Sequence, residues 1–585
     1  MLAKPDNHRY RTEIDGLRAI AVLGVIAFHY GFIANGYLGV DVFFVISGFL
    51  ITGIIKRELD EGRFSIVNFY LRRTRRILPL AIFVPAVALL VGMKIMLPHD
   101  LRSLAENVVA TNFFANNVLQ VVAINNYWDV WNNYKPLMHT WSLGVEEQYY
   151  FFYPLLFLLI GKKRASWIVP AVSAFAAISL VMCFLPQFDD THKFYIITFR
   201  FWELAVGGLA AIVMKDRLIK HKLSWILALA LIVIQCLPWV SPMPVIPLLV
   251  TTALTATLLI SDPSSDKIAL GILGNPFSIW IGKISFSLYM WHQVVLAFWR
   301  YALVQVLGPL DYALIFAITI ALSAFTYAFV EQPFRDKKRV STKTLFAWLI
   351  PAFVCTSAVG LWVFKKHGVL RDVPEMNIYK SAPLAPNAEE YNARIYDMDK
   401  DFTSTNKVKV LVAGNSFARD WANVLLESRF KDQIEVSYIY EPEKSKTVAD
   451  RSTKADVVFC SFAPRSEVQA YIPEMKKVWI VGVKSFGMSN GVFFNHRGPG
   501  YFEQRTAMEP GTYEQNARLK AEWGDRYIDL ASKVLDGNKT VPVFTPEHKF
   551  ISQDGRHLTQ PGAQFFAGLE DAELARILGP LMKAR

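Results

Sequence analysis

The sequence predicts a polytopic α-helical membrane bundle followed by one soluble α/β domain. Hydrophobic residues make up 53% of the 585 residues, and many apolar runs approach or exceed the length that crosses roughly 30 Å of hydrocarbon. These runs stop after about Phe364. Residues 371–585 instead alternate short β-like and helical stretches with loops, and about 215 residues suit one soluble domain. The chain is therefore expected to contain two domains.

Eleven apolar segments are candidates for membrane helices. They start near Leu17, Leu38, Ile77, Tyr149, Ser166, Ile196, Leu223, Val245, Ser285, Ala313 and Thr344. The first ten are assigned to a membrane domain of residues 1–336, and the eleventh to an additional transmembrane helix within residues 337–370. Residues 371–405, rich in Pro, Asn, Ala and Asp, indicate a linker or wrapping segment, and residues 406–585 form the soluble domain.

The distribution of positive charge predicts the orientation of the bundle. Lys and Arg concentrate in the loops at residues 56–76, 162–164, 215–222 and 335–343. The long segment 98–145 carries only Arg102 and Lys135. By the positive-inside rule the N-terminus is cytoplasmic, and eleven crossings place the soluble domain outside. These loops explain much of the net charge of +12, and no basic stripe is interleaved with aromatic residues, so no nucleic-acid partner is expected.

Titratable side chains occur within or at the ends of several apolar segments. A charged group at the centre of a membrane helix costs roughly 2.5–3.5 kcal/mol, so each one indicates a pocket, a pair or a water-filled path. The residues are Arg18, His29, Asp41, Glu146, Glu147, Arg200, Glu203, His292, Arg300 and Glu331. Taken singly they could also be interfacial anchors or helix-to-helix pairs, as the i,i+3 spacing of Arg200 and Glu203 allows.

His29 is the titratable residue least easily explained by packing alone. Its imidazole could be packed as a polar aromatic ring, but it could also take a proton from a hydroxyl group near neutral pH, as a general base does. Asp41 follows after a short turn and could orient the ring and stabilise its protonated form.

Several motifs, in this order along the chain, resemble those of the membrane acyltransferase-3 family. They are IDGLRAIAV at 14–22, FH at 28–29, GVDVFFVISGFLI at 39–51, YLRRTRRILP at 70–79, HTWSLGVEEQYY at 139–150, SFSLYMWH at 285–292 and EQPFR at 331–335. The resemblance implies transfer of an acyl group, usually acetyl from acetyl-CoA, to a hydroxyl group of an extracytoplasmic glycan. It implies no permanently bound cofactor, because acetyl-CoA is the donor substrate.

The resemblance also assigns roles to residues. His29 corresponds to the essential histidine and Asp41 to its acidic neighbour, while Arg18, Arg73 and Arg76 correspond to the arginines implicated in donor handling. Arginine suits the phosphates of coenzyme A because its guanidinium presents forked donors, although the cluster at 72–76 could also serve as an orientation signal alone. Further candidates for the membrane site are Glu146, His292 and Glu331.

The soluble domain opens with an apolar strand that runs into Gly414-Asn415-Ser416 and then into an amphipathic helix. Ser416 is therefore expected at the carboxyl edge of a sheet, where ligand sites of α/β proteins gather. Backbone N–H groups at the start of the helix could hold an oxyanion. The motif is not the Gly-x-Ser-x-Gly elbow, because Ala418 stands where the second glycine would be.

Far downstream, Asp554 and His557 have the spacing that lets a carboxylate hold one imidazole nitrogen while the other faces a serine. Together with Ser416 they resemble the SGNH hydrolase fold, which implies a flavodoxin-like parallel sheet with Ser416 as nucleophile, His557 as base and Asp554 as its orienting residue. Asn415 replaces the family's usual Asp. The family's Gly-x-Asn block was not found, so the candidates for the oxyanion hole are Ser416, Ser461, Ser489 and Asn490.

The layout of the whole chain resembles that of bacterial O-antigen and polysaccharide O-acetyltransferases. This implies an inner-membrane enzyme with a periplasmic C-terminal domain, whose partners are acetyl-CoA, membrane lipids and a surface polysaccharide or lipid-linked glycan. Lipopolysaccharide O-antigen is the first acceptor considered, with peptidoglycan or capsule as alternatives. A glycan esterase and a transporter are alternatives of other classes, and the soluble domain could also bind glycan without covalent chemistry at Ser416. The four cysteines lie far apart, so no metal site is expected.

Overall fold

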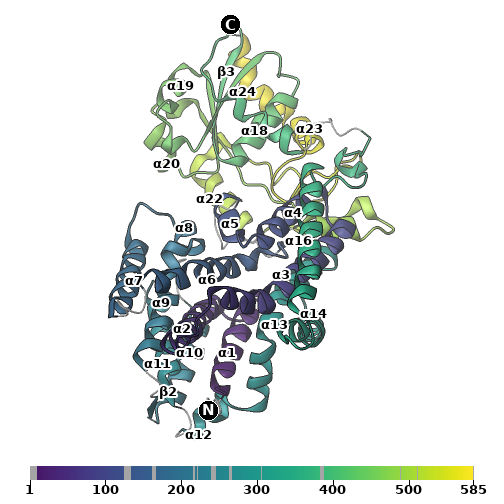
Figure 1. Cartoon of the computed structure of the whole chain (residues 1–585). Coiled ribbons are helices and arrows are strands. Elements are labelled where there is room, and N and C mark those ends of the chain that lie inside the picture. Colours follow the sequence, from purple (N-terminus) through teal and green to yellow (C-terminus); the bar gives the residue numbers. More distant parts are fainter. Residues whose placement is uncertain are drawn as a thin grey trace, which may run out of the picture. The chain divides into compact units, whose positions relative to one another are not determined.

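The computed structural model describes residues 10–583 except 124–133, 161–165, 215–217, 221, 239–244, 263–265, 305, 382–387, 488 and 510. The chain divides into two compact units (Figure 1). The first consists of Met1–Arg300 and Val306–Gly368, and the second of Tyr301–Gln305 and Val369–Arg585. We call them the membrane unit and the outer unit, after the locations predicted above. Each is described separately below.

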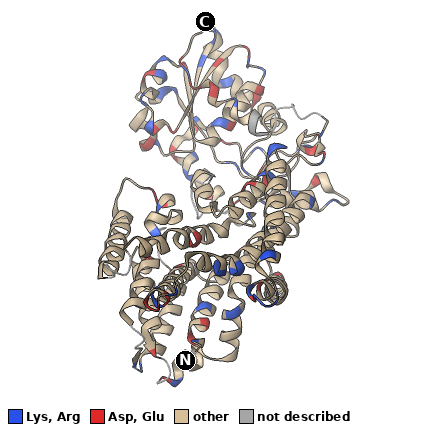
Figure 2. Cartoon of the chain, in the orientation of Figure 1, with Lys and Arg blue, Asp and Glu red and all other residues tan. Residues whose placement is uncertain are grey.

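A helix occupies each of the eleven segments proposed as membrane spans. They are α1 (Thr12–His29), α2 (Gly39–Asp60), α3 (Ile66–Ile95), α6 (Trp141–Ile160), α7 (Ile168–Phe184), α9 (Ile197–Met214), α10 (Ser224–Cys236), α11 (Val245–Ile260), α13 (Pro276–Ala302), α14 (Pro309–Thr326) and α16 (Thr342–Lys365). Lys and Arg, Asp and Glu are sparse along most of these helices (Figure 2). The predicted helical bundle is confirmed at this level.

The described helices differ in how well they could span a membrane. Five are long and apolar enough: those within Gly36–Asp60, Ile66–Ile95, Asp190–Met214, Pro309–Arg335 and Thr342–Lys365. A sixth candidate is the pair α12 (Lys267–Leu273) and α13, which is bent by 43°. Three further apolar helices, α7, α10 and α11, have 10–17 residues. The count of eleven crossings and their orientation therefore stay predictions.

The segment 98–145, treated above as a long loop, contains additional helices. α4 (Pro98–Asn112) starts with proline at its first turn, where the missing N–H leaves no helical bond unmade. α4 buries Leu101, Leu104 and Val108, and it packs against α3 and α16. α5 (Asn116–Ala123) follows it. The mixed polar and apolar composition of this segment concealed two amphipathic helices.

Close packing of α2 against α9 forms the centre of the membrane unit. A β-carbon at Gly48 would collide with the carbonyl oxygen of Leu204, and one at Gly207 would collide with that of Val45. Small residues at such contacts let two backbones approach closely within a membrane. This approach brings the polar residues near the start of α2 against those near the start of α9.

The outer unit is built on a five-stranded parallel sheet, as predicted. Its strands are β3 (Val408–Gly414), β4 (Ile434–Tyr440), β5 (Val457–Ser461), β6 (Val478–Val481) and β8 (Tyr527–Ile528), in the order β4-β3-β5-β6-β8. This is the flavodoxin-like order, in which ligands bind where the strand order reverses, between β3 and β5. The sequence-derived fold of this domain is therefore correct in its topology.

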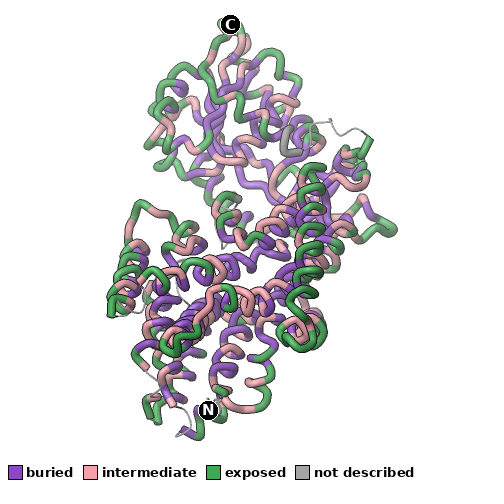
Figure 3. Tube along the Cα trace, viewed as in Figure 1, coloured by how far each residue is buried: buried purple, intermediate pink, exposed green. Residues whose placement is uncertain are grey.

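Helices cover both faces of the sheet. They include α18 (Ser416–Glu427), α19 (Val448–Lys454), α20 (Arg465–Tyr471), α22 (Thr512–Trp523), α23 (Gln560–Leu569) and α24 (Asp571–Lys583). Val410 and Val412 of β3 belong to one buried apolar cluster, whereas Leu411 and Ala413 belong to another. Because successive side chains of a strand point to opposite faces, each cluster lies on one face, and the strands are buried (Figure 3).

Part of the segment 371–405 wraps onto the outer unit instead of linking freely. Tyr391 and Ile395, four residues apart, are buried in the cluster that contains Val410. The short helix Tyr396–Met398 lies beside β4. Residues 382–387 of this segment lie outside the described residues. Of the two alternatives given above, a linker or a wrapping segment, the burial of Tyr391 and Ile395 supports the second for this part of the segment.

Candidate active site

The backbone around Ser416 is shaped by its two neighbours. Gly414 ends β3 with a φ of +141°, a conformation that favours glycine, and a β-carbon there would collide with the side chain of Ser461. Asn415 is the N-cap of α18, and its side-chain oxygen accepts a hydrogen bond from the N–H of Phe417 at 3.0 Å. Ser416 is thereby held at the first turn of α18, as the sequence predicts.

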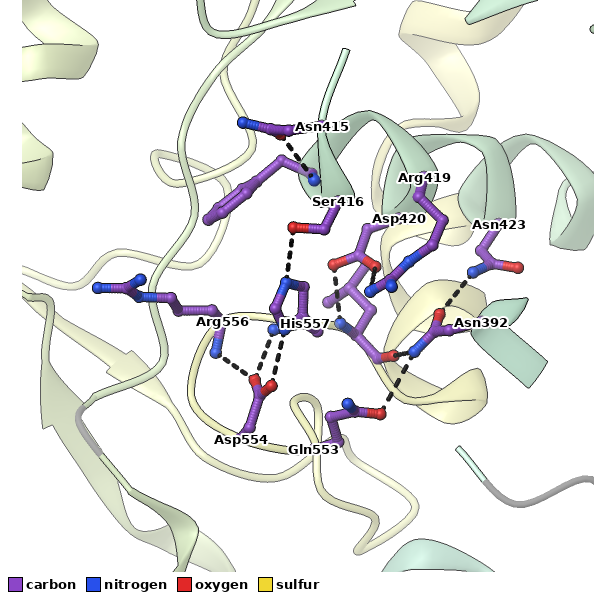
Figure 4. Close-up of polar contacts among 12 residues, drawn as sticks. Asn392, Asn415, Ser416, Arg419, Asp420, Asn423, Gln553, Asp554, Arg556 and His557 are labelled. Carbon is purple, nitrogen blue, oxygen red and sulfur yellow. Dashed lines mark hydrogen bonds and ion pairs between the residues drawn. The ribbon is translucent and has the colours of Figure 1, made fainter. Parts of the chain in front are cut away.

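Ser416, His557 and Asp554 form a hydrogen-bonded chain (Figure 4). The Ser416 hydroxyl lies 2.8 Å from Nε2 of His557, and Nδ1 of His557 lies 2.7 Å from Oδ2 of Asp554. Oδ1 of Asp554 accepts the N–H groups of His557 at 2.8 Å and Arg556 at 3.0 Å. With the imidazole proton on Nδ1, Nε2 is the acceptor of the serine proton, which is the geometry of a serine nucleophile with its base.

The electrostatics of this site favour an ionised Asp554. Burial alone would raise the pKa of Asp554, but the charge of His557 and the hydrogen bonds from His557 and Arg556 hold that pKa well below its usual value. An ionised carboxylate beside Nδ1 stabilises the imidazolium that forms when His557 takes the serine proton.

A buried carboxylate that the sequence analysis did not identify holds the backbone next to His557. Asp420, on α18, is fully buried, and its Oδ2 accepts the N–H of Leu558 at 2.9 Å. The same oxygen lies 2.7 Å from Nζ of Lys484, whose side chain is 2% exposed. Burial lowers the pKa of Lys484, and the charge of Asp420 opposes this. Asp420 therefore fixes the backbone next to His557, and its charge is balanced by Lys484.

Two candidates for the oxyanion hole, Asn490 and Ser461, make different contacts. The amide of Asn490 donates to the carbonyl of Ser552 at 2.5 Å, two residues before Asp554. A role of Asn490 in the oxyanion hole stays a prediction. Ser461 ends β5, next to β3, and its hydroxyl accepts the N–H of Asn415 at 3.4 Å. Of these two polar side chains, Ser461 is the one beside the Ser416 turn.

In the membrane unit, His29 ends α1 and is buried. Its ring centroid lies 5.2 Å from that of His292 on α13, which in turn lies 5.0 Å from that of His139. Arg300 donates to the carbonyl of His29 at 3.2 Å. Three imidazoles thus cluster within the helices. His139 was not named as a candidate, although it is the first residue of the motif at 139–150.

The sequence predicts that Asp41 orients the ring of His29, but the structure pairs Asp41 with Arg200 instead. Its Oδ1 lies 2.5 Å from Nη2 of Arg200, and Nε of Arg200 lies 3.3 Å from Oε1 of Glu203. Within the described part of the chain, Asp41 makes no contact with His29. The physical reason is that Asp41 lies near the start of α2, which packs against α9, whereas the ring of His29 packs against α13. The i,i+3 pairing of Arg200 and Glu203 is as anticipated.

The three predicted donor-binding arginines, Arg18, Arg73 and Arg76, line one cavity together with Glu146, which accepts from the Ser47 hydroxyl at 2.9 Å. Among the residues described, His29 does not line this cavity, but Tyr289 does, and its ring centroid lies 5.5 Å from that of His292. Glu331 lies apart from this lining, where it accepts from Arg335 at 2.9 Å and Ser287 at 3.2 Å. The cavity is basic and is linked to the three imidazoles through the ring of Tyr289.

Comparison with known proteins identifies the membrane unit. Residues 11–328 match the family described as an acyltransferase domain. The chain belongs to this acyltransferase family. The resemblance inferred from the motifs is confirmed, and the protein is an acyltransferase with several apolar helices, as expected of a membrane enzyme. The match ends before Val369, where the larger segment of the outer unit begins, so it does not cover the triad around Ser416.

Relatives of the chain carry O-acetyltransferase names. It is 30% identical over 416 residues to a Staphylococcus aureus (strain MSSA476) protein named provisionally as an O-acetyltransferase, covering 66% of this chain and 67% of the relative. It is 29% identical over 389 residues to a peptidoglycan O-acetyltransferase of Listeria monocytogenes serovar 1/2a (strain ATCC BAA-679 / EGD-e), covering 61% of each. A Bacillus subtilis (strain 168) protein named provisionally as a peptidoglycan O-acetyltransferase is 28% identical over 402 residues, covering 62% of each. No solved structure matches the chain significantly.

Proposed function

We propose that the protein transfers an acetyl group from cytoplasmic acetyl-CoA to a hydroxyl group of an extracytoplasmic polysaccharide. The observation that carries this proposal is the union, in one chain, of an acyltransferase domain and a separate unit with Ser416, His557 and Asp554 within hydrogen-bonding distance. The acyltransferase domain is suited to binding an activated acyl donor. The unit with the triad is suited to covalent transfer of the acyl group to an alcohol.

The basic cavity of the membrane unit is proposed as the donor site. Arg18, Arg73 and Arg76 offer forked, positively charged donors that match the 3′-phosphate and pyrophosphate of coenzyme A. The acetyl thioester would then reach toward the imidazole cluster that contains His29. His29 either activates a glycan hydroxyl directly or takes part in passing the acetyl group on toward Ser416.

The second route uses the outer unit as an acyl carrier. His557 removes the proton of Ser416 while the serine oxygen attacks the acetyl carbonyl, and the donor leaves with that proton. The N–H of Ser416 at the start of α18 and the hydroxyl of Ser461 are proposed to face the oxyanion. In the second half-reaction His557 deprotonates the sugar hydroxyl, which attacks the acetyl-serine and restores free Ser416.

The acceptor is proposed to be an envelope glycan in the periplasm of a bacterium, with the enzyme in the inner membrane and its N-terminus in the cytoplasm. Lipopolysaccharide O-antigen is one candidate. Peptidoglycan and capsule are the others, and peptidoglycan is favoured by the names of two relatives. All three are glycans with free hydroxyl groups.

The test is a deletion strain complemented with wild-type or Ser416→Ala protein. Alkali-released acetate is measured separately on purified lipopolysaccharide and on purified peptidoglycan, and the acetylated glycan identifies the acceptor. We expect acetate to be lost on deletion, restored by the wild type and not restored by Ser416→Ala. A higher acetate level with Ser416→Ala than with the wild type would instead identify an esterase.

A further inference from the structure

Two exposed tyrosines stand at the sheet edge beside Ser416 and have no role in the triad. Tyr440 is the last residue of β4, and in the parallel register it lies opposite Gly414, two residues before Ser416. Tyr396 comes from the wrapping segment, and its ring centroid lies 5.9 Å from that of Tyr440. Each ring is 41% exposed.

The pair is held firmly against the Ser416 turn. Tyr438, two residues before Tyr440 on the same face of β4, is fully buried, and its hydroxyl donates to the carbonyls of Gly414 at 3.3 Å and Asn415 at 3.1 Å. The ring of Tyr396 packs edge-on against Tyr438, with 5.7 Å between centroids. Tyr438 therefore joins β4 and the ring of Tyr396 to the backbone just before Ser416.

The chemistry of this surface matches a sugar ring. A tyrosine presents a flat apolar face together with one hydroxyl group, and a pyranose presents an apolar face of C–H groups with hydroxyl groups at its edge. The two tyrosine rings are inclined at 75°, so one ring can stack on a sugar while the other meets its edge. Arg419, one turn into α18, pairs with Asp420 at 3.3 Å and also interacts with Tyr396, which places a guanidinium group beside this surface.

The opposite side of the Ser416 turn differs in character. Phe417 and Phe462 are half-buried, with ring centroids 5.1 Å apart, and Phe417 lies 6.0 Å from the ring of His557. These two rings are apolar, and that of Phe417 borders the base directly. This apolar surface suits the small acetyl group. The side that carries Tyr396 and Tyr440 is then available for the polysaccharide.

We propose that Tyr396 and Tyr440 bind a pyranose ring of the acceptor glycan and so present its hydroxyl group to the acetyl-serine. The inference rests on the function proposed above and adds the site that recognises the acceptor. The ligand class is a neutral or acidic hexopyranose unit of a polysaccharide.

The experiment uses the full chain carrying Tyr396→Ala, Tyr440→Ala or Tyr440→Phe, with Tyr513→Ala as the control. Tyr513 is 49% exposed and lies on α22, away from β4. Purified protein is assayed for hydrolysis of 4-nitrophenyl acetate, which needs the triad but no glycan. The same variants are expressed in the deletion strain, and the alkali-released acetate of the envelope glycan is measured.

We expect both alanine variants to hydrolyse 4-nitrophenyl acetate within about twofold of wild type and to lower glycan acetate roughly tenfold, the loss that truncation of an aromatic anchor commonly causes. Tyr440→Phe should retain most of the transfer, and Tyr513→Ala should change neither readout. Wild-type glycan acetate in Tyr440→Ala, or an equal loss of both activities, would overturn the acceptor site. Wild-type glycan acetate in Ser416→Ala would instead overturn the acetyl-serine route of the proposed function.

Discussion

Asp554 is the residue whose charge decides the chemistry proposed for the outer unit. It holds Nδ1 of His557 at 2.7 Å, which fixes the tautomer that leaves Nε2 facing Ser416. We expect Asp554→Asn to lower kcat for 4-nitrophenyl acetate by about 10³–10⁴-fold, because an amide can favour the wrong tautomer. Asp432→Asn, at an exposed position, serves as the matched control. A loss of less than about tenfold would contradict the assignment.

The same carboxylate predicts how the stability of the outer unit depends on pH. Since the folded pKa of Asp554 lies well below its ordinary value of 3.8, ionised Asp554 stabilises the fold above that value. This contribution is lost as the pH falls below about 4, toward the folded pKa. Thermal unfolding followed between pH 7 and pH 3 should show a smaller acid-induced fall in Tm for Asp554→Asn than for wild type. Parallel curves for the two proteins would contradict this.

The start of α18 depends on a cap that also positions the nucleophile. Asn415 accepts the N–H of Phe417, and asparagine and aspartate are nearly equal as N-caps. Asn415 therefore caps this turn as well as an aspartate would. We expect Asn415→Ala to destabilise the outer unit by about 1 kcal/mol and to slow ester hydrolysis, whereas Asn415→Asp retains both properties. Thermal unfolding and 4-nitrophenyl acetate turnover measure the two effects, and equal behaviour of the two variants would refute the capping role.

The close contact between α2 and α9 depends on the absence of a side chain at Gly48. A side chain at Gly48 would collide with the backbone of α9, whereas a β-carbon at Gly53, on the same helix, meets nothing within 4 Å. We expect Gly48→Val to cost several kcal/mol and to reduce the yield of monodisperse protein sharply, because backbones cannot move aside as side chains do. Gly53→Val is the matched control. Size-exclusion chromatography in detergent compares them, and similar yields would contradict the packing argument.

The helices, the parallel sheet and the triad of Ser416, His557 and Asp554 could be predicted, because each is marked by a short stretch of sequence. Long apolar runs mark the helices, and the order strand, Gly-Asn-Ser, helix marks the nucleophile turn. The partner of Asp41 could not be predicted, since Arg200 lies 159 residues away and meets it only through the close packing of α2 on α9. Asp420 and Lys484 were missed for the same reason, because their pairing depends on how α18 and the loop after β6 fold together.

The division of the chain into two compact units predicts that its two activities can be separated. In the proposed mechanism, ester hydrolysis requires only Ser416, His557 and Asp554, which all belong to the outer unit. The proposed transfer from acetyl-CoA to glycan also requires the membrane unit, where His29 lies in the imidazole cluster. We therefore expect His29→Ala to abolish glycan acetylation in the deletion strain while hydrolysis of 4-nitrophenyl acetate by the purified protein stays within about twofold of wild type. Ser416→Ala should abolish both.

The control for this comparison is His192→Ala, because His192 is about half exposed and lies outside the imidazole cluster. It should retain both activities. If His29→Ala retains glycan acetylation, the imidazole cluster has no part in transfer. If His29→Ala loses ester hydrolysis as well, the two units do not act as separable steps, since a buried imidazole of one unit would then control the triad of the other.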